Sequence, residues 1–202
     1  MKPSSKVAAE LKEIWMRFAL RGVRYSNNYK KLDAIYMIGD PWRLALPSDQ
    51  YRFAETNRLI LEKFGRVGSL LEIGCGEGHQ SLHLQHVCGR LTGLDVSAMA
   101  VERARRRCPR GEFFVGDVFS QEVDARAPFD LVVACEVLYY MIDVPAALRR
   151  MQTLGRNNLV TYFAGEMETL DPQVLSLPRA VSEVLMFEPA RWRAVWWRGD
   201  QV

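Results

Sequence analysis

The sequence predicts an α/β fold in which helices cover a mostly parallel β-sheet that ends in an antiparallel hairpin. From residue 69 onward, short apolar runs alternate with helix-like segments, which is the pattern of strand–helix–strand units. Near the end of the chain, two apolar runs are joined by a link that is long enough only for an antiparallel pair. The length of 202 residues, with 49% hydrophobic residues, suits one domain.

Five apolar runs predict buried parallel strands, because each is short and rich in aliphatic side chains. These runs are residues 69–73, 91–94, 112–115, 129–134 and 158–163. Residues 97–108 predict a helix that begins at Ser97 as its N-cap and ends before Pro109. Pro145 predicts the first turn of another helix.

The hairpin is predicted from residues 183–187 and 192–197, joined by residues 188–191. Its tryptophans are interpreted as core and surface cover rather than as ligand contacts. They are Trp192, Trp196 and Trp197.

The segment before the first strand predicts a charged amphipathic helix followed by an aromatic-rich stretch. The apolar face of that helix consists of Val7, Leu11, Ile14 and Phe18. We expect residues 1–68 to form a helical extension or lid over one end of the sheet. Residues 69–202 are expected to form the core, so that the chain is a single domain overall.

Composition narrows the class of protein. No run of roughly 18 uncharged residues could span a membrane. The four cysteines are widely spaced without a C-x-x-C pair, which favours a reducing, cytoplasmic location. The formal net charge of +3 is too small to predict a nucleic-acid partner. Four arginines at helical spacing predict a solvated face, with a polyanion-binding stripe as the alternative: Arg103, Arg106, Arg107 and Arg110.

The motif LLEIGCGEG at residues 70–78 is a hydrophobic strand that runs directly into a glycine loop. Glycine at 74 and 76 lets the backbone turn sharply and lets a ligand approach closely. A dinucleotide fingerprint would need a third glycine at 79, where this chain has His79. The loop therefore favours a cofactor without phosphates, whose amino-acid end lies over the turn.

Two acidic residues at later strand ends indicate a nucleoside. Asp95 ends the second strand nineteen residues after Gly76, where a carboxylate accepts hydrogen bonds from ribose hydroxyls. Asp117, in the Gly116-Asp117-Val118 step after the third strand, can accept from the exocyclic amine of adenine. Three strand ends are thus predicted to converge on one ligand at the switch point of the sheet.

These segments, together with FDLVVACEVLYYM at residues 129–141, resemble the class I S-adenosylmethionine (SAM) dependent methyltransferases over about residues 65–200. The resemblance implies a Rossmann-like, seven-stranded, mostly parallel sheet with an antiparallel last strand. It also implies SAM as the cofactor. The Asp40-Pro41-Trp42 step, Tyr51-Arg52 and the CEVLYY run are further similar to the nodulation protein S group. Members of that group N-methylate a sugar amine of a chito-oligosaccharide.

The resemblance implies the following cofactor-binding residues: Glu72, Gly74, Cys75, Gly76, Asp95, Val96, Asp117, Val118 and Cys135. Glu72, Gly74 and Gly76 would form or support the methionine end of the pocket. Asp117 and Val118 would contact adenine, and Cys135 with Glu136 would line the floor near the sulfonium.

Aromatic side chains are candidates for the acceptor pocket, because their flat faces can stack on a sugar or another ring. The predicted substrate-binding residues are Trp42, Tyr51 and Arg52. The predicted catalytic or orienting residues are Glu136, Tyr139, Tyr140 and His79.

The three histidines, His79, His83 and His86, have the spacing of one helix face. His79 and His86 would lie about 10.5 Å apart along the axis, whereas two ligands of one zinc ion each lie about 2 Å from it. All three therefore cannot share one ion. We predict no metal site, with a two-histidine site as the alternative that neither an H-E-x-x-H pattern nor a nearby cysteine pair supports.

The predicted function is methyl transfer from SAM to a small-molecule or saccharide acceptor, at nitrogen or oxygen, by direct in-line transfer. No membrane is expected to take part. Two alternatives remain open at this stage: an RNA or protein methyltransferase, and a SAM-binding module without catalysis. The sequence predicts neither the identity of the acceptor nor the oligomeric state.

Overall fold

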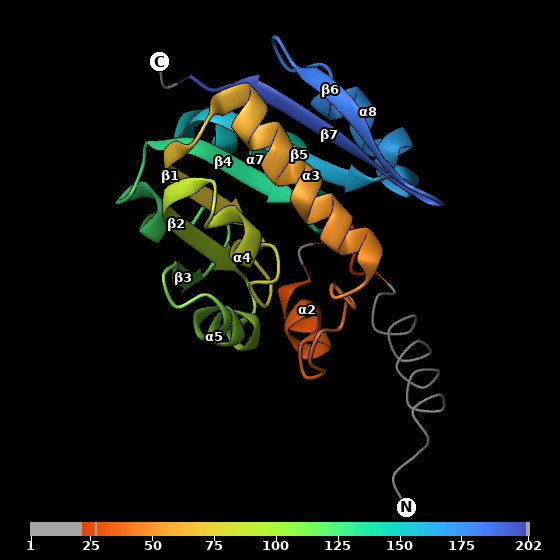
Figure 1. Ribbon diagram of the computed structural model, residues 1–202. Coiled ribbons are helices and arrows are strands. Elements are labelled where there is room, and N and C mark those ends of the chain that lie inside the picture. Colours follow the sequence, from red (N-terminus) through yellow and green to blue (C-terminus); the bar gives the residue numbers. More distant parts are fainter. Residues whose placement is uncertain (1–21, 27, 201–202) are drawn as a thin grey trace, which may run out of the picture.

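A seven-stranded sheet in the order β3-β2-β1-β4-β5-β7-β6 forms the centre of the computed structural model, which describes residues 22–26 and 28–200 (Figure 1). The strands are β1 (Val67–Ile73), β2 (Cys88–Asp95), β3 (Glu112–Val115), β4 (Phe129–Cys135), β5 (Gly155–Phe163), β6 (Val181–Phe187) and β7 (Ala190–Arg198). β1 to β5 pair in parallel, while β7 is antiparallel to both β5 and β6. The predicted fold class is thereby confirmed.

The predicted strands all form, but four of the first five are longer than their apolar runs. β5 begins at Gly155 rather than at 158, because polar side chains at a strand end pair their backbone as readily as apolar ones. The hairpin strands are likewise longer than predicted, and only Glu188 and Pro189 separate them.

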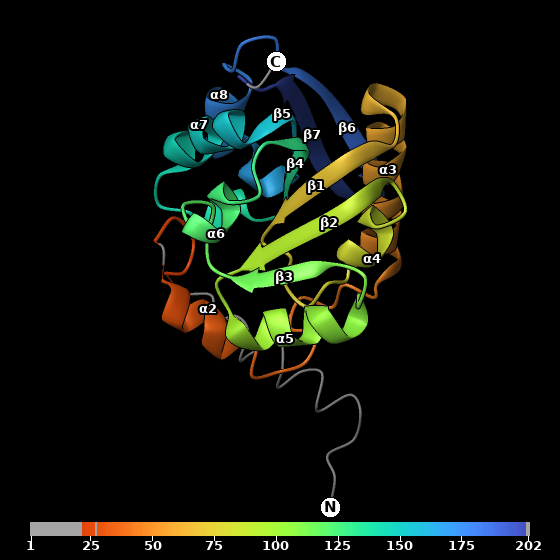
Figure 2. The ribbon, with the colours of Figure 1, turned by 90° about the vertical axis from the view of Figure 1, so that its left-hand side faces the viewer.

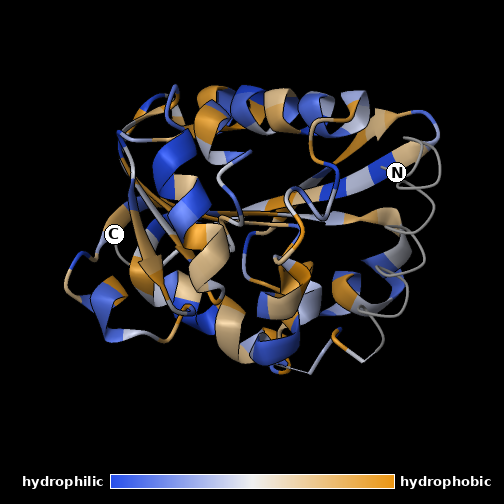
Figure 3. Cartoon of the chain, turned by 90° about the horizontal axis from the view of Figure 1, so that it is seen from below, coloured by the Kyte–Doolittle hydropathy of each residue, from blue (hydrophilic) through white to orange (hydrophobic). Residues whose placement is uncertain are grey.

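Helices cover both faces of the sheet (Figure 2). They are α2 (Tyr29–Ile35), α3 (Pro47–Phe64), α4 (Ser81–Leu84), α5 (Ala98–Arg107), α6 (Gln121–Asp124), α7 (Val144–Leu154) and α8 (Met167–Val174), with short 3-10 helices η1 (Leu138–Tyr140) and η2 (Ala164–Glu166). α3, α4 and α5 supply apolar side chains to one core cluster, and α6, α7 and α8 to the other. Along these helices hydrophobic and hydrophilic residues alternate, as expected where one side packs on a sheet (Figure 3).

Two helix boundaries follow the sequence prediction. The Ser97 hydroxyl accepts from the Ala100 amide at 3.2 Å, so Ser97 is the N-cap of α5. Pro145 lies in the first turn of α7, whose N-cap is Asp143. No helix in the described part of the chain is long and apolar enough to cross a membrane.

The segment before β1 has two parts. The predicted amphipathic helix around Val7, Leu11, Ile14 and Phe18 lies outside the described residues. α2 lies at the carboxyl edge of the parallel strands, near β3 and α5 (Figure 2). α3, by contrast, buries Leu59 and Ile60 completely against the sheet. Among the described residues before β1, those that precede α3 have the position expected of a lid, whereas α3 does not.

Candidate active site

A cavity of about 490 Å³ opens at the carboxyl edge of the parallel strands. Every predicted site residue except Tyr51 and His79 lines it. The lining set includes Glu72, Gly74, Cys75, Gly76, Asp95, Val96, Asp117, Val118, Cys135, Glu136, Tyr139, Tyr140, Trp42 and Arg52. Segments that are far apart in the sequence thus meet at one site, where the switch point of such a sheet places a ligand.

The glycine loop after β1 needs glycine for two reasons. Gly74 and Gly76 have φ angles of 73° and 51°, a region that other residues rarely adopt. A Cβ atom on Gly74 would also lie 2.5 Å from the Cγ2 atom of Val137, and one on Gly76 would lie 3.0 Å from the Tyr36 hydroxyl. Val137 and Tyr36 therefore pack so closely against the loop that they leave no room for a side chain at either position.

Asp95 connects the end of β2 to the glycine loop. One carboxylate oxygen accepts from the Gly76 amide at 2.9 Å, and the other accepts from the Ser97 amide at 2.9 Å. Burial raises its pKa to about 6. Each carboxylate oxygen has a further lone pair, so the side chain can still accept from a pair of hydroxyls in the cavity.

α2 is bonded to the ends of β2 and β3. The Tyr29 hydroxyl donates to Asp117 at 3.1 Å, and the other oxygen of Asp117 accepts from the Phe119 amide at 2.9 Å. The Ser97 hydroxyl donates to Asp33 of α2 at 2.6 Å. These contacts hold α2 over the part of the cavity that Asp95 and Asp117 border.

One acidic side chain and one basic side chain in the cavity wall are buried. Glu72 is 2% exposed and accepts from the Ser81 hydroxyl at 2.5 Å, and burial raises its pKa to about 8. Arg52, also 2% exposed, donates to Gln80 at 2.9 Å and to Asp49 at 3.2 Å. Within the described part of the chain, the Arg52 Nε and the Gln80 Nε2 atoms are buried without a hydrogen-bond partner. Two donors therefore remain available at this end of the cavity.

Glu136 follows β4 with a φ of 57°, the left-handed region that a side chain other than glycine seldom adopts. Its carboxylate accepts from the Thr161 hydroxyl at 3.1 Å and from the Tyr139 hydroxyl at 3.3 Å. Burial raises the pKa of Glu136 above its ordinary value. Strained backbone at a cavity wall is typical of functional sites, because the surroundings must hold the residue there.

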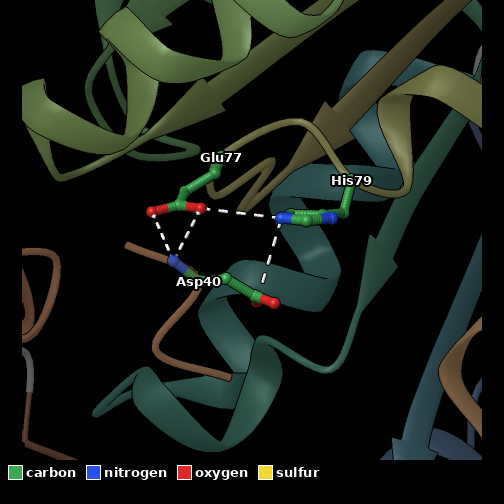
Figure 4. Close-up of side chains that lie close together, drawn as sticks. All are labelled: Asp40, Glu77 and His79. Carbon is green, nitrogen blue, oxygen red and sulfur yellow. Dashed lines mark hydrogen bonds and ion pairs between the residues drawn. The ribbon is translucent and has the colours of Figure 1, made fainter. Parts of the chain in front are cut away.

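Two predicted residues lie elsewhere, and their assignments are corrected. Tyr51 of α3 does not line the cavity, and its ring packs on Phe187 at the end of β6, with ring centroids 5.4 Å apart. His79 does not line the cavity, and its side chain lies beside those of Glu77 and Asp40 (Figure 4). Its Nε2 atom lies 3.5 Å from a Glu77 oxygen and 3.8 Å from an Asp40 oxygen.

The three histidines do not share a helix, contrary to the sequence interpretation, because α4 contains only residues 81–84. In the part of the chain that the structure describes, Asp40, Glu77 and His79 are close enough together to hold a metal ion. Glu77, however, already accepts from Arg103 at 2.5 Å and from the Asp40 amide at 3.0 Å. Hydrogen bonds from His79, Arg103 and the Asp40 amide lower the pKa of Glu77 to about 2 despite its burial, so protein groups already stabilise its charge.

The predicted arginine face is also corrected. Arg103 and Arg107 turn toward Glu77, and α5 ends at Arg107, so Arg110 lies beyond the helix and bonds Gln85. Arg106 stays exposed and pairs with Glu102. The helical spacing was correct only for the first three residues, since the helix ends before the fourth.

The sequence interpretation missed several lining residues. They are Arg24, Tyr29, Tyr36, Gln80, Glu166 and Trp192, among others. Trp192, interpreted as cover, is 5% exposed and both joins the core and lines the cavity. The aromatic-rich stretch before α3 was the one available signal for Tyr29 and Tyr36. Glu166 and Gln80 stand in no recognisable motif, and only the folded chain brings them to the site.

Comparison with known proteins identifies the family. The model of the nodulation protein S (NodS) family matches residues 26–169. The chain belongs to the nodulation protein S family. It is 38% identical over 142 residues to nodulation protein S of Sinorhizobium fredii (strain NBRC 101917 / NGR234), covering 68% of this chain and 62% of that protein. It is 36% identical over 127 residues to nodulation protein S of Rhizobium tropici, covering 61% of this chain and 52% of that protein.

The chain spans 52% to 63% of the length of the three nodulation protein S relatives it matches. Among solved structures it is similar to the N-methyltransferase NodS from Bradyrhizobium japonicum WM9 in complex with S-adenosyl-L-homocysteine (SAH). That match has a TM-score of 0.68 at 25% identity, and it covers 87% of this chain and all of that one. The structural likeness agrees with the fold class predicted from the sequence.

Proposed function

We propose that this protein is a SAM-dependent methyltransferase that transfers a methyl group to an amine of a small polar acceptor, such as a sugar amine. One observation carries the proposal: a single cavity joins the glycine loop, Asp95 and Asp117 to the partly buried carboxylate of Glu136. The first three suit a nucleoside with an amino-acid end, and the last suits an amine. The relationship to an N-methyltransferase that was solved with SAH supports both parts.

The residues at the glycine loop fit the amino-acid end of SAM. Arg52 Nε and Gln80 Nε2 are buried donors without a partner among the described residues, and they border the cavity beside Gly74. A carboxylate would satisfy both donors. We therefore assign Arg52 to the cofactor rather than to the acceptor. We assign Glu72 to the neighbouring ammonium, whose positive charge would lower the raised pKa of Glu72 and favour its carboxylate form.

SAM supplies a methyl group on a cationic sulfur, which is already electrophilic. The protein then has to align the acceptor nitrogen with the methyl carbon and exclude water. An N–C bond forms as the C–S bond breaks, and SAH leaves. The nitrogen must be neutral to react, so one proton has to leave the ammonium form. Glu136 is suited to accept that proton, because its raised pKa makes it a stronger base than an ordinary carboxylate.

The aromatic side chains suit an acceptor ring. Trp42 and Tyr140 contact each other with ring centroids 5.6 Å apart, and Tyr140 contacts Tyr139 at 4.7 Å. Aromatic residues from two segments that are distant in sequence, one before α3 and one after β4, thus form one wall of the cavity. We also propose a cytoplasmic location, since all four cysteines are free and buried.

The test is transfer of a labelled methyl group from SAM to matched acceptors. Glucosamine and glucose differ only in the group at carbon 2, so the pair separates amine from hydroxyl methylation. We expect label in glucosamine and none in glucose. Label in glucose alone would contradict N-methylation, and label only in added RNA would contradict the small-acceptor assignment.

A further inference from the structure

Glu166 is a second carboxylate in the cavity wall, apart from Glu136. It is the last residue of η2, which directly follows β5, and it is 4% exposed. Its two oxygens bind the segment before α2: one accepts from the Tyr25 hydroxyl at 2.8 Å, and the other forms an ion pair with Arg24. Arg24 and Glu166 both line the same cavity as Glu136.

Tyr139 contacts Glu136 directly and Glu166 through Arg24. Tyr139 donates to Glu136, while the Arg24 guanidinium lies 5.4 Å from the centroid of the Tyr139 ring. The Tyr25 amide also donates to the Tyr139 carbonyl at 2.9 Å, which fixes the segment of Arg24 over this ring. Glu166 therefore borders the acceptor end of the cavity, not the nucleoside end at Asp117.

The two side chains of the Arg24–Glu166 ion pair differ in their exposure to solvent. The Arg24 side chain is 54% exposed, whereas that of Glu166 is 5% exposed. The guanidinium itself loses little on moving into water, because more than half of the Arg24 side chain is already exposed. A buried carboxylate left alone is strongly unfavourable, so it requires another cation when Arg24 leaves. The cavity is the side from which such a cation can enter.

We propose that Glu166 is a specificity-determining residue that binds the protonated amine of the incoming acceptor, before Glu136 accepts its proton, and that Arg24 occupies this position in the acceptor-free protein. This inference rests on the proposed function, because it assigns the acceptor's chemistry at the same site. A protonated primary amine replaces the guanidinium and restores the charge balance of Glu166. A hydroxyl at the same place brings no charge, so the residue selects amines over alcohols.

The experiment is calorimetric titration of the SAH-loaded protein with glucosamine, with glucose as the uncharged probe. Three variants are compared with the wild type: Arg24→Gln, Glu166→Gln and the double variant. We expect Arg24→Gln to bind glucosamine about tenfold more tightly and Glu166→Gln about tenfold more weakly. The double variant should resemble Glu166→Gln, and glucose should bind all four proteins alike. Unchanged SAH affinity would show that each variant folds.

Tyr25→Phe is the matched control, because it removes a hydrogen bond to the same carboxylate but no charge. We expect it to change glucosamine affinity by about twofold or less. The inference is overturned if Arg24→Gln and Glu166→Gln both weaken binding, since the ion pair would then only stabilise the structure of the site. It is also overturned if Arg24→Gln has no effect, or if neither it nor the wild type binds glucosamine.

Methyl transfer separates this inference from the proposed function. Label transferred to an amine, with glucosamine binding insensitive to Glu166, would leave the proposed function standing and overturn the assignment of Glu166 to the amine. The expected binding pattern without any transfer would leave the assignment of Glu166 standing and overturn the proposed function.

Discussion

Asp95 accepts from two backbone amides and still faces the cavity, so it both shapes the glycine loop and is available to a ligand. We predict that Asp95→Ala weakens SAM binding by on the order of 1 to 3 kcal/mol, because charged hydrogen bonds to ribose hydroxyls are lost. Titration calorimetry measures this. Asp130→Ala is the control, since Asp130 lies at the amino end of the strands with Ser69 and Arg156. Equal SAM affinity in both folded variants would remove the ribose assignment.

Glu72 gives a pH-dependent contribution to stability. Its pKa is raised from 4.5 to about 8 by burial, so between these values the folded state keeps a proton that the unfolded state has lost. The free energy of unfolding therefore falls as pH rises through this window, by at most about 1.4 kcal/mol per pH unit. Glu72→Gln cannot titrate, so the wild type should lose stability relative to this variant from pH 5 to pH 8. Denaturant unfolding curves for both proteins test this, and parallel pH profiles would contradict it.

Glu136, Tyr139 and Tyr140 are predicted to affect turnover rather than cofactor affinity. Glu136→Gln removes the proposed proton acceptor, and Tyr139→Phe removes a hydrogen bond to it. We expect turnover to fall by about tenfold or more in Glu136→Gln, and in at least one of the tyrosine-to-phenylalanine variants, with little change in SAM affinity. Steady-state kinetics together with SAM titration check this. Wild-type turnover in all three variants would refute the assignment of the acceptor pocket.

At the scale of elements, α2 and the described residues between it and α3 line the cavity, and we propose that they act as its lid. Hydrogen bonds from Tyr29 to Asp117 and from Ser97 to Asp33 link α2 to two strand ends. We predict that deleting residues 1–45 speeds SAH dissociation and impairs acceptor binding more than it lowers the unfolding free energy. Deletion of residues 1–21 is the control, because it leaves α2 and Trp42 in place. Stopped-flow release of SAH distinguishes the two, and equal release rates would contradict the lid.

The sequence predicted those elements whose boundaries are determined by their own residues. Apolar runs predicted the strands, Ser97 predicted the start of α5, and the short link predicted the hairpin. α3 was missed, because five of its residues face the core but include Arg52 and Thr56, which break the apolar stripe. α4 was predicted too long, since the histidine spacing resembled a helix that the chain does not continue past Leu84.

At the scale of the whole molecule, the part of the site nearest the nucleoside was predictable and the acceptor end was not. Gly74, Gly76 and Asp117 follow strands, and Asp95 ends one, so parallel topology alone brings them together. Glu166 and Trp192 reach the cavity only through the connection after β5 and the antiparallel return of β7, which no local pattern specifies.

Tyr51 and His79 do not line the cavity, although the sequence predicted that they would. Tyr51 and His79 stand next to site residues in sequence, but neighbours on a helix or turn point in different directions. Tyr51 therefore packs on Phe187, while the adjacent Arg52 lines the cavity.

The most direct test of the account is transfer of a labelled methyl group from SAM to small amines by the whole protein. If the protein N-methylates small amines, glucosamine gives a labelled N-methyl product and one SAH is formed per methyl transferred. We expect a marked loss of product with Glu136→Gln. SAM binding without label in any amine, or label confined to RNA or protein, would contradict the account.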